Sequence, residues 1–208
     1  MVRKVMMVSE LRKTLIDLYD EKEDQLPFHG WNHIQFVTQK AIEFARHLEA
    51  DIFLVESASL THDLNYIAEK NSDPDAGSEL RKSILSKIGY RPGDIEIIER
   101  VINEAHIVNR HKRVISIEAQ ALSDADTLFK ALPITPVIIE KKYLDENGIE
   151  LLTLATKIVR DQKVLLDNGT LFYTELANQK YLRWARTNIE LWMNVLECLE
   201  EEDIRSLL

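Results

Sequence analysis

The sequence has few residues of the kinds that build disulfide-rich or low-complexity proteins. Its 208 residues include one cysteine, Cys198, so no intramolecular disulfide can form and no zinc site can be built from cysteines. A reducing compartment is the simplest setting for such a chain, and we expect Cys198 to be inert near the end of an amphipathic helix. Glycine (6 residues) and proline (5 residues) are also scarce, which argues against long disordered linkers.

Long apolar runs and an excess of positive charge are absent as well. No stretch approaches the roughly 20 apolar residues that span a membrane, and the first residues, MVRKVMMVSELRK, lack the apolar core and cleavage site of a leader peptide. Lys and Arg number 26 against 35 Asp and Glu, a net charge of −9, which argues against an extended nucleic-acid surface. The sequence predicts a cytoplasmic protein without a membrane segment, and a local positive site for a small phosphorylated substrate stays open.

What the chain has in abundance is apolar residues at intervals of three and four, which predict an all-α fold. We find no alternating strand pattern, internal repeat or low-complexity segment. Ser9 and Asp51 are expected to cap the first and third helices. We expect helices at about 9–19, 34–48, 51–64, 80–88, 95–106, 117–132, 134–145, 149–167 and 173–200.

Ionisable side chains interrupt the apolar pattern at two places. His62 and Asp63 end the apolar segment SASLTHDL, and neither side chain is stable on an apolar face without a partner. Asp124 and Asp126 lie within another apolar stripe, where two carboxylates repel each other unless a cation or donors compensate. Because they are two residues apart on a helix, at most one is expected to face the same point as His62. The other faces solvent, caps a helix or orients a ligand histidine.

Further histidines are placed to complete such a site. His29 and His33, in FHGWNH, are four residues apart and share a face if the segment is helical, and His106 ends the expected fifth helix. Two histidines and two aspartates suit a borderline or hard divalent ion such as manganese, iron, nickel, magnesium or zinc. Four protein ligands around a six-coordinate ion leave about two positions for water and a substrate oxygen, an arrangement that favours hydrolysis.

The order of these residues resembles that of the HD superfamily of metal-dependent phosphohydrolases. His33, His62-Asp63 and Asp126 follow one another on successive expected helices, and the segments FHGWNHI, ASLTHDL and SDADTL are similar to the family's motifs. The C-terminal segment from Phe172 is similar to the closing helix of small bacterial and archaeal members. The resemblance implies a compact multi-helix HD-domain fold with additional C-terminal helices.

For the domain organisation, the resemblance implies a single HD-type helical domain over residues 1–208. The metal-site core is expected at about 28–130 and the C-terminal helices at about 133–203. A homodimer is left open.

The resemblance also implies a ligand set: His33, His62, Asp63 and Asp126 hold one divalent metal ion. Asp126 is preferred over Asp124 because the family's ligand aspartate stands directly before a small or polar residue and a leucine, as in the segment DTL. Asp124 is then left as a residue that supports a ligand or lies on the surface.

Three residues are implied to take part in catalysis. Asp63 acts with the metal-activated water, His29 matches an auxiliary histidine that touches a substrate phosphate, and His106 contacts the substrate or donates a proton to the leaving group. The chain departs from the family at Asn65, where glycine is common, and in the loop 71–79, which has no histidine. These departures favour a single metal ion.

Together these features predict a phosphohydrolase: a phosphomonoesterase, phosphodiesterase or nucleotide phosphatase that acts on a nucleotide or other small phosphorylated metabolite through metal-activated water. One alternative is a non-catalytic HD-type signalling module that senses a nucleotide. Another is a metal-dependent lyase or oxygenase on the same scaffold, since a fold does not fix the chemistry.

The remaining charged residues are interpreted mainly as solvated. The basic run 110–113 is expected to be a surface loop, with phosphate binding at the site entrance as the alternative. Lys157, Arg160 and Lys163 recur at helical spacing and are expected to face solvent, with the cleft as the alternative. His47 and His111 are expected on the surface.

Overall fold

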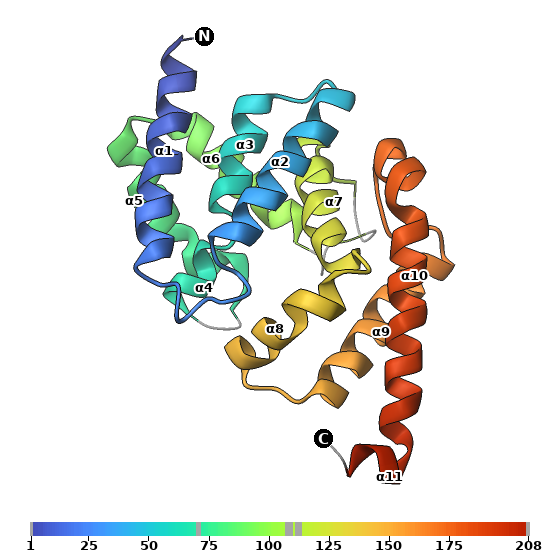
Figure 1. Ribbon diagram of the computed structural model, residues 1–208. Helices are drawn as coiled ribbons and strands as arrows, with labels where there is room; N and C mark the ends of the chain where they lie inside the picture. Colours follow the sequence, from blue (N-terminus) through green and yellow to red (C-terminus); the bar gives the residue numbers. More distant parts are fainter. Residues whose placement is uncertain (1, 70–71, 107–109, 111–113, 207–208) are drawn as a thin grey trace. The chain divides into compact units, whose positions relative to one another are not determined.

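The computed structural model describes residues 2–69, 72–106, 110 and 114–206, and its regular structure is helical, with no strand in these ranges (Figure 1). The expectation of an all-α fold is therefore confirmed. None of the described helices is long and apolar enough to cross a membrane. The α-helices are α1 (Val2–Asp20), α2 (Trp31–His47), α3 (Ile52–Thr61), α4 (Leu64–Ala68), α5 (Ser78–Ile88), α6 (Pro92–Ala105), α7 (Ile117–Ala131), α8 (Glu140–Asn147), α9 (Leu151–Asp167), α10 (Glu175–Glu200) and α11 (Glu202–Arg205).

The chain divides into two compact units, Met1–Asp126 and Thr127–Leu208. In the first unit, α3 is the central helix and packs against α1, α2 and α6. Nearly every residue of α3 is buried, because its sequence IFLVESASLT is apolar or small apart from Glu56. Its neighbours cover it with one apolar face each. The fully buried apolar side chains of this unit include Leu11, Leu15, Ile34, Val37, Phe44, Val55, Leu60 and Ile98.

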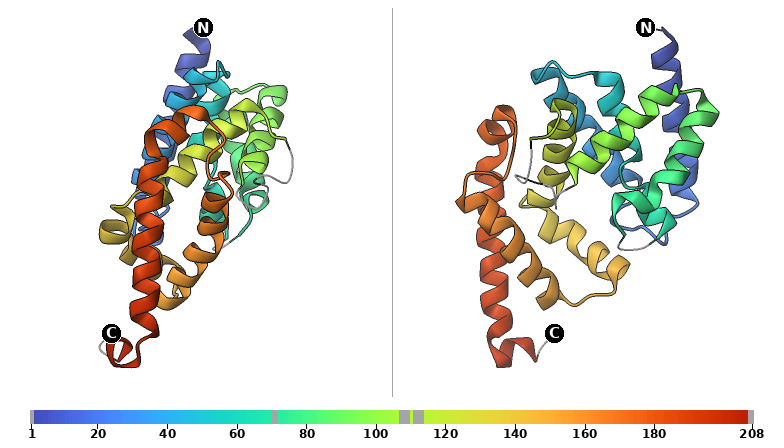
Figure 2. Two further views of the ribbon diagram at one scale, coloured as in Figure 1. Left: turned by 90° about the vertical axis from the view of Figure 1, so that its right-hand side faces the viewer. Right: turned by 180° about the vertical axis from the view of Figure 1, so that it is seen from behind.

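The second unit is built on the pairing of α9 with α10 (Figures 1 and 2). Trp192 of α10 is its largest buried side chain and packs with Leu154, Ala155 and Leu199. Thr174 caps α10 by accepting a hydrogen bond from the Ala177 N–H at 3.1 Å. A π-helical turn, Thr135–Ile139, precedes α8 in this unit.

Two helix ends differ from the sequence-based expectations. The first helix begins at Val2, so Ser9 lies inside α1 and the expectation that Ser9 caps it is wrong. Asp51 does cap α3, because its side chain accepts from the N–H groups of Phe53 (2.9 Å) and Leu54 (3.3 Å). That helix ends at Thr61 instead of continuing to residue 64. The break falls at the His-Asp pair and positions the site.

Candidate metal centre

His62 and Asp63 occupy the turn between α3 and α4. His62 is the C-cap of α3, and Asp63 departs from helical geometry at φ −100° and ψ 15° before α4 begins at Leu64. A continuous helix would point two adjacent side chains about 100° apart. The break lets both side chains turn to the same point.

His33 approaches that point from the first turn of α2. This helix begins at Trp31, with Gly30 as its N-cap in extended geometry. A side chain at Gly30 would lie 2.6 Å from the Leu26 carbonyl oxygen, so the glycine lets the preceding turn close tightly against the helix start. His33 is then 1% exposed, and α2 and α3 pack side by side.

Three side-chain atoms converge within the first unit, and a fourth lies beside one of them. The His33 Nε2 atom lies 3.4 Å from the His62 Nε2 atom and 3.0 Å from Asp63 Oδ2, which is 3.2 Å from His62 Nε2. Asp126, on α7, brings its Oδ1 atom to 3.5 Å from His33 Nε2. Ligand atoms of His33, His62 and Asp63 all lie within 4.8 Å of one another, a spacing suited to a metal ion. The structure thus brings together three of the four residues that the resemblance implied, and it places the fourth, Asp126, next to His33.

A backbone contact fixes which nitrogen of His62 faces the centre as an acceptor. The His62 Nδ1 atom lies 2.8 Å from the Ser59 carbonyl oxygen, which can only accept, so Nδ1 carries the proton. In the neutral ring, Nε2 therefore presents its lone pair to the cluster. This is the arrangement that metal-ligating histidines commonly show, and the donor set fits a divalent ion.

Burial and charge act together on the pKa values of the cluster. Burial lowers the pKa of His33, although the Asp63 and Asp126 carboxylates oppose the shift. Burial also acts to lower the pKa of His62, but those carboxylates outweigh it and raise that pKa. For Asp63, burial favours the neutral acid, yet the two imidazoles hold its pKa well below the usual range. Asp63 is ionised at neutral pH, the state in which a carboxylate ligates.

Asp124 lies away from solvent and interacts with a different partner. It is fully buried, and its Oδ1 atom lies 3.8 Å from Nη1 of Arg110, whose Nη2 atom also donates to the Ser123 carbonyl oxygen at 2.9 Å. The alternative that Asp124 lies on the surface is therefore wrong. Arg110 itself is buried, whereas residues 111–113 of the basic run, with His111, lie outside the described residues.

His29 lies beside His33, but for a different reason from the one expected. Because α2 begins at Trp31, His29 and His33 do not share a helix face. The His29 ring nevertheless contacts the His33 ring edge-on, with centroids 5.6 Å apart, and stacks on Tyr66 at 3.8 Å and 12°. No sequence pattern singles out Tyr66, although it follows the His-Asp pair by only three residues.

His106 is half-buried at the C-terminal end of α6, and its role in leaving-group protonation stays a prediction. His47 is exposed at the end of α2, as expected. On α9, Lys157 and Arg160 are exposed, and Arg160 and Lys163 pair with carboxylates of the same helix, Asp161 and Asp167.

Asn65, the departure from the family pattern, has a structural role. Its side chain is buried and donates to the Ser72 carbonyl oxygen at 2.8 Å, while the Ser72 hydroxyl donates to the Asn65 carbonyl oxygen at 3.3 Å. These bonds tie the loop after α4 to the turn that carries His62 and Asp63.

Comparisons with known proteins give one partial relative and several similar folds. No family model matches the chain. A segment of 114 residues, half of the chain, is 30% identical to the uncharacterized protein YpgQ of Bacillus subtilis (strain 168). The match covers 52% of YpgQ, so the chain spans about half the length of the curated relative it matches.

Solved structures show the same fold at low identity. The crystal structure of Bacillus subtilis YpgQ in complex with ADP matches with a TM-score of 0.65 at 21% identity, covering 98% of this chain and 99% of that one. The Lin1889 protein of Listeria innocua matches with a TM-score of 0.60 at 19% identity, covering 94% and 96%. A protein from Lactobacillus plantarum gives 0.68 at 16% identity, covering 93% and 95%. These similarities show that the chain shares its all-α fold with solved structures.

Proposed function

We propose that the chain is a metal-dependent phosphohydrolase of the HD type, acting on a nucleotide or another small phosphorylated metabolite. The observation that carries the proposal is the convergence of His33, His62 and Asp63, two imidazole nitrogens and a carboxylate, with the Asp126 carboxylate beside His33. A divalent ion held by them would polarise a phosphate oxygen and lower the pKa of a water molecule.

The chain's own residues supply the other requirements of hydrolysis. Asp63, ionised by its position between two imidazoles, can accept a hydrogen bond from an attacking water. His29 offers a ring N–H to a substrate phosphate beside His33, and stacking on Tyr66 fixes the plane of that ring. His106 is proposed as the donor of a proton to the leaving group.

A nucleotide is the substrate class that the comparisons favour. YpgQ, which shares the fold, was crystallised in complex with ADP. A diphosphate group is a hard oxygen ligand suited to a divalent ion and to a neighbouring histidine donor.

The test begins with metal-stripped protein reconstituted separately with Mn²⁺, Mg²⁺, Ni²⁺, Fe²⁺ and Zn²⁺. Phosphate release is measured on nucleoside mono-, di- and triphosphates, and release of nitrophenol on p-nitrophenyl and bis-p-nitrophenyl phosphate. His33→Gln is compared with His47→Gln, because both histidines lie on α2 but His47 is exposed at its far end. We expect the first variant to lose bound metal and activity and the second to keep both. Wild-type protein that binds no ion, or full activity in His33→Gln, would refute the proposal.

A second function, nucleotide sensing without turnover, is favoured by the same ADP complex of a protein that shares the fold. Isothermal titration of the metal-loaded chain with ADP distinguishes the two. Saturable binding with no product after prolonged incubation supports a sensor, whereas metal-dependent product formation supports the hydrolase.

A further inference from the structure

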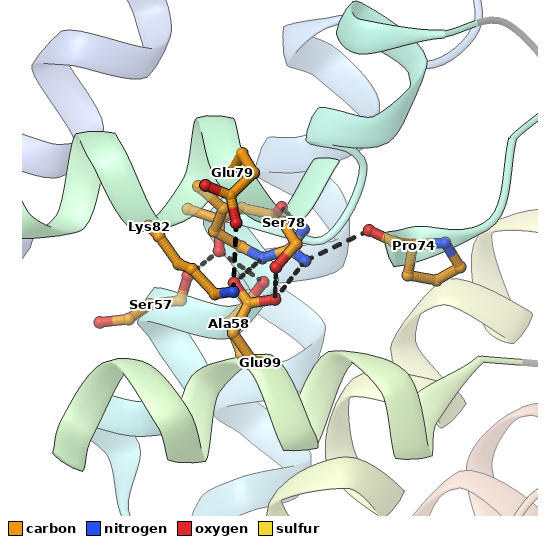
Figure 3. Close-up of polar contacts among 9 residues, drawn as sticks. Ser57, Ala58, Pro74, Ser78, Glu79, Lys82 and Glu99 are labelled. Carbon is orange, nitrogen blue, oxygen red and sulfur yellow. Dashed lines mark hydrogen bonds and ion pairs between the residues drawn. The ribbon is translucent and has the colours of Figure 1, made fainter. Parts of the chain in front are cut away.

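Arg81, on α5, is fully buried in the first unit and makes four polar contacts. Its Nε and Nη2 atoms lie 2.6 and 2.8 Å from the two carboxylate oxygens of Glu99, on α6. Its Nη1 atom donates to the Thr61 carbonyl oxygen at 3.3 Å, and Nη2 donates to that of Pro74 at 3.2 Å. Figure 3 shows Glu99, with Ser78 and Pro74 around this contact, and the Ser78 hydroxyl donates to Glu99 at 2.9 Å.

One of the two carbonyl groups that Arg81 contacts, that of Thr61, belongs to the last residue of α3. Carbonyls in the last turn of a helix lack partners within the helix. In α3, the Ser59 carbonyl accepts from His62, and the Thr61 carbonyl accepts from Arg81. The peptide group of Thr61 leads directly into His62, so the guanidinium holds the backbone at the point where the helix breaks.

Arg81 also contacts the segment that packs behind the His62-Asp63 turn, through the carbonyl of Pro74. Pro74 begins η1, the 3₁₀ helix Pro74–Gly77, and η1 packs against α4. Gly77 lies so close to α4 that a Cβ atom there would be 2.5 Å from the Asn65 backbone nitrogen. By binding both Thr61 and Pro74, Arg81 connects the residues before the His-Asp turn with the segment that packs behind it.

We infer that Arg81 is a positioning residue that sets the metal affinity of the centre by fixing the His62-Asp63 turn from both ends. The inference rests on the proposed metal centre. Glu99 is part of this arrangement, because its carboxylate neutralises the Arg81 guanidinium. Without it, a buried positive charge would oppose the binding of a cation nearby. A buried ion pair is a weak source of stability compared with apolar packing. What an apolar pair could not supply is the donor to the Thr61 carbonyl.

The test compares variants that keep the charge of a side chain but change its length or shape. In Arg81→Lys, the single ammonium group cannot bond Glu99, Thr61 and Pro74 in the same fork geometry. Glu99→Asp shortens the carboxylate arm and is the second variant, in case Arg81→Lys does not fold. The matched control is Arg12→Lys, because Arg12 on α1 pairs at 2.8 Å with Glu56, in the middle of α3. This control loosens the same helix without touching its C-terminal end.

The readouts are the Mn²⁺ dissociation constant of metal-stripped protein by calorimetry, the visible absorption of the Co²⁺-loaded protein, and the melting temperature without metal. We expect Arg81→Lys and Glu99→Asp to weaken Mn²⁺ binding about 10- to 100-fold and to change the Co²⁺ spectrum. We expect Arg12→Lys to bind as wild type does even where its melting temperature falls. Wild-type affinity in both Arg81→Lys and Glu99→Asp, or equal weakening in Arg12→Lys, overturns the inference. Wild-type protein that binds no Mn²⁺ overturns the proposed metal centre itself.

Discussion

Gly77 offers a direct test of how closely the segment behind the His-Asp turn must pack. Its backbone angles, φ −87° and ψ −5°, are open to any residue, so an alanine is excluded by space alone. An added Cβ would lie 2.5 Å from the Asn65 nitrogen and 2.9 Å from the Leu64 carbonyl carbon, both backbone atoms. Normal separation is about 3.5 Å, so η1 or α4 has to move by about 1 Å.

The expected cost of Gly77→Ala follows from that displacement. Overpacking against a fixed backbone costs about 1–3 kcal/mol of unfolding free energy, and the replacement of glycine returns about 0.5–1 kcal/mol through the unfolded chain. We therefore expect a net loss of up to about 2.5 kcal/mol. Urea denaturation followed by circular dichroism measures it. Because Asn65 lies two residues after Asp63, we also expect weaker Mn²⁺ binding in calorimetry.

Gly93→Ala is the matched control. Gly93 lies in the first turn of α6, is exposed, and has no atom within 4 Å of the position that a Cβ would occupy. That substitution is expected to stabilise the chain by about 0.5–1 kcal/mol and to leave Mn²⁺ binding unchanged. The reasoning is refuted if Gly77→Ala is as stable as Gly93→Ala.

Three smaller perturbations test other parts of the chain. Asp51→Ala removes the cap of α3 and is expected to cost about 1 kcal/mol in urea denaturation, and an unchanged midpoint would contradict it. Burial raises the pKa of Glu140 from 4.5 to about 7, so native protein holds its proton longer than unfolded protein and stability falls as the pH rises through that window. Glu140→Gln should therefore match wild type near pH 4.5 and exceed it by about 1–2 kcal/mol above pH 7, whereas a constant difference across pH would contradict the pKa shift. Mn²⁺ at a hundred times its dissociation constant should add about 2.7 kcal/mol, removable by EDTA, and a melting temperature insensitive to both would count against the centre.

Periodicity predicted most of the longer helices because they bury one apolar face, and the cap at Asp51 followed from its side-chain chemistry. Periodicity did not predict the helix break at His62. The segment before His62 is apolar on nearly every side, and such a segment carries no periodic signal for its own end. The start of α1 was missed because Val2, Val5 and Met6 are exposed in the structure and formed no stripe with the later residues.

Of the residues that the resemblance implied as ligands, His33, His62 and Asp63 converge and Asp126 lies next to His33. The side chains that support them were not predicted. Arg81 is the clearest case, and a signal for it was present. It precedes Ile84 by three residues and Leu85 by four, so it lies on the buried face of α5. A charge on an apolar face requires a partner, but Glu99 is 18 residues away on another helix, and no local pattern connects them.

The charges of the first unit also bear on which ion the centre can hold. The two buried arginines described near the site, Arg81 and Arg110, are balanced by Glu99 and Asp124. Neither pair adds net charge to the cluster. In a metal-bound form both imidazoles would be neutral ligands, so the carboxylates of Asp63 and Asp126 would give a sum of at most −2. A divalent cation neutralises that sum, whereas a monovalent ion leaves a buried negative charge and a trivalent ion a positive one, both costly away from water. If these four residues are the ligands, as proposed above, their charge balance suits a divalent ion.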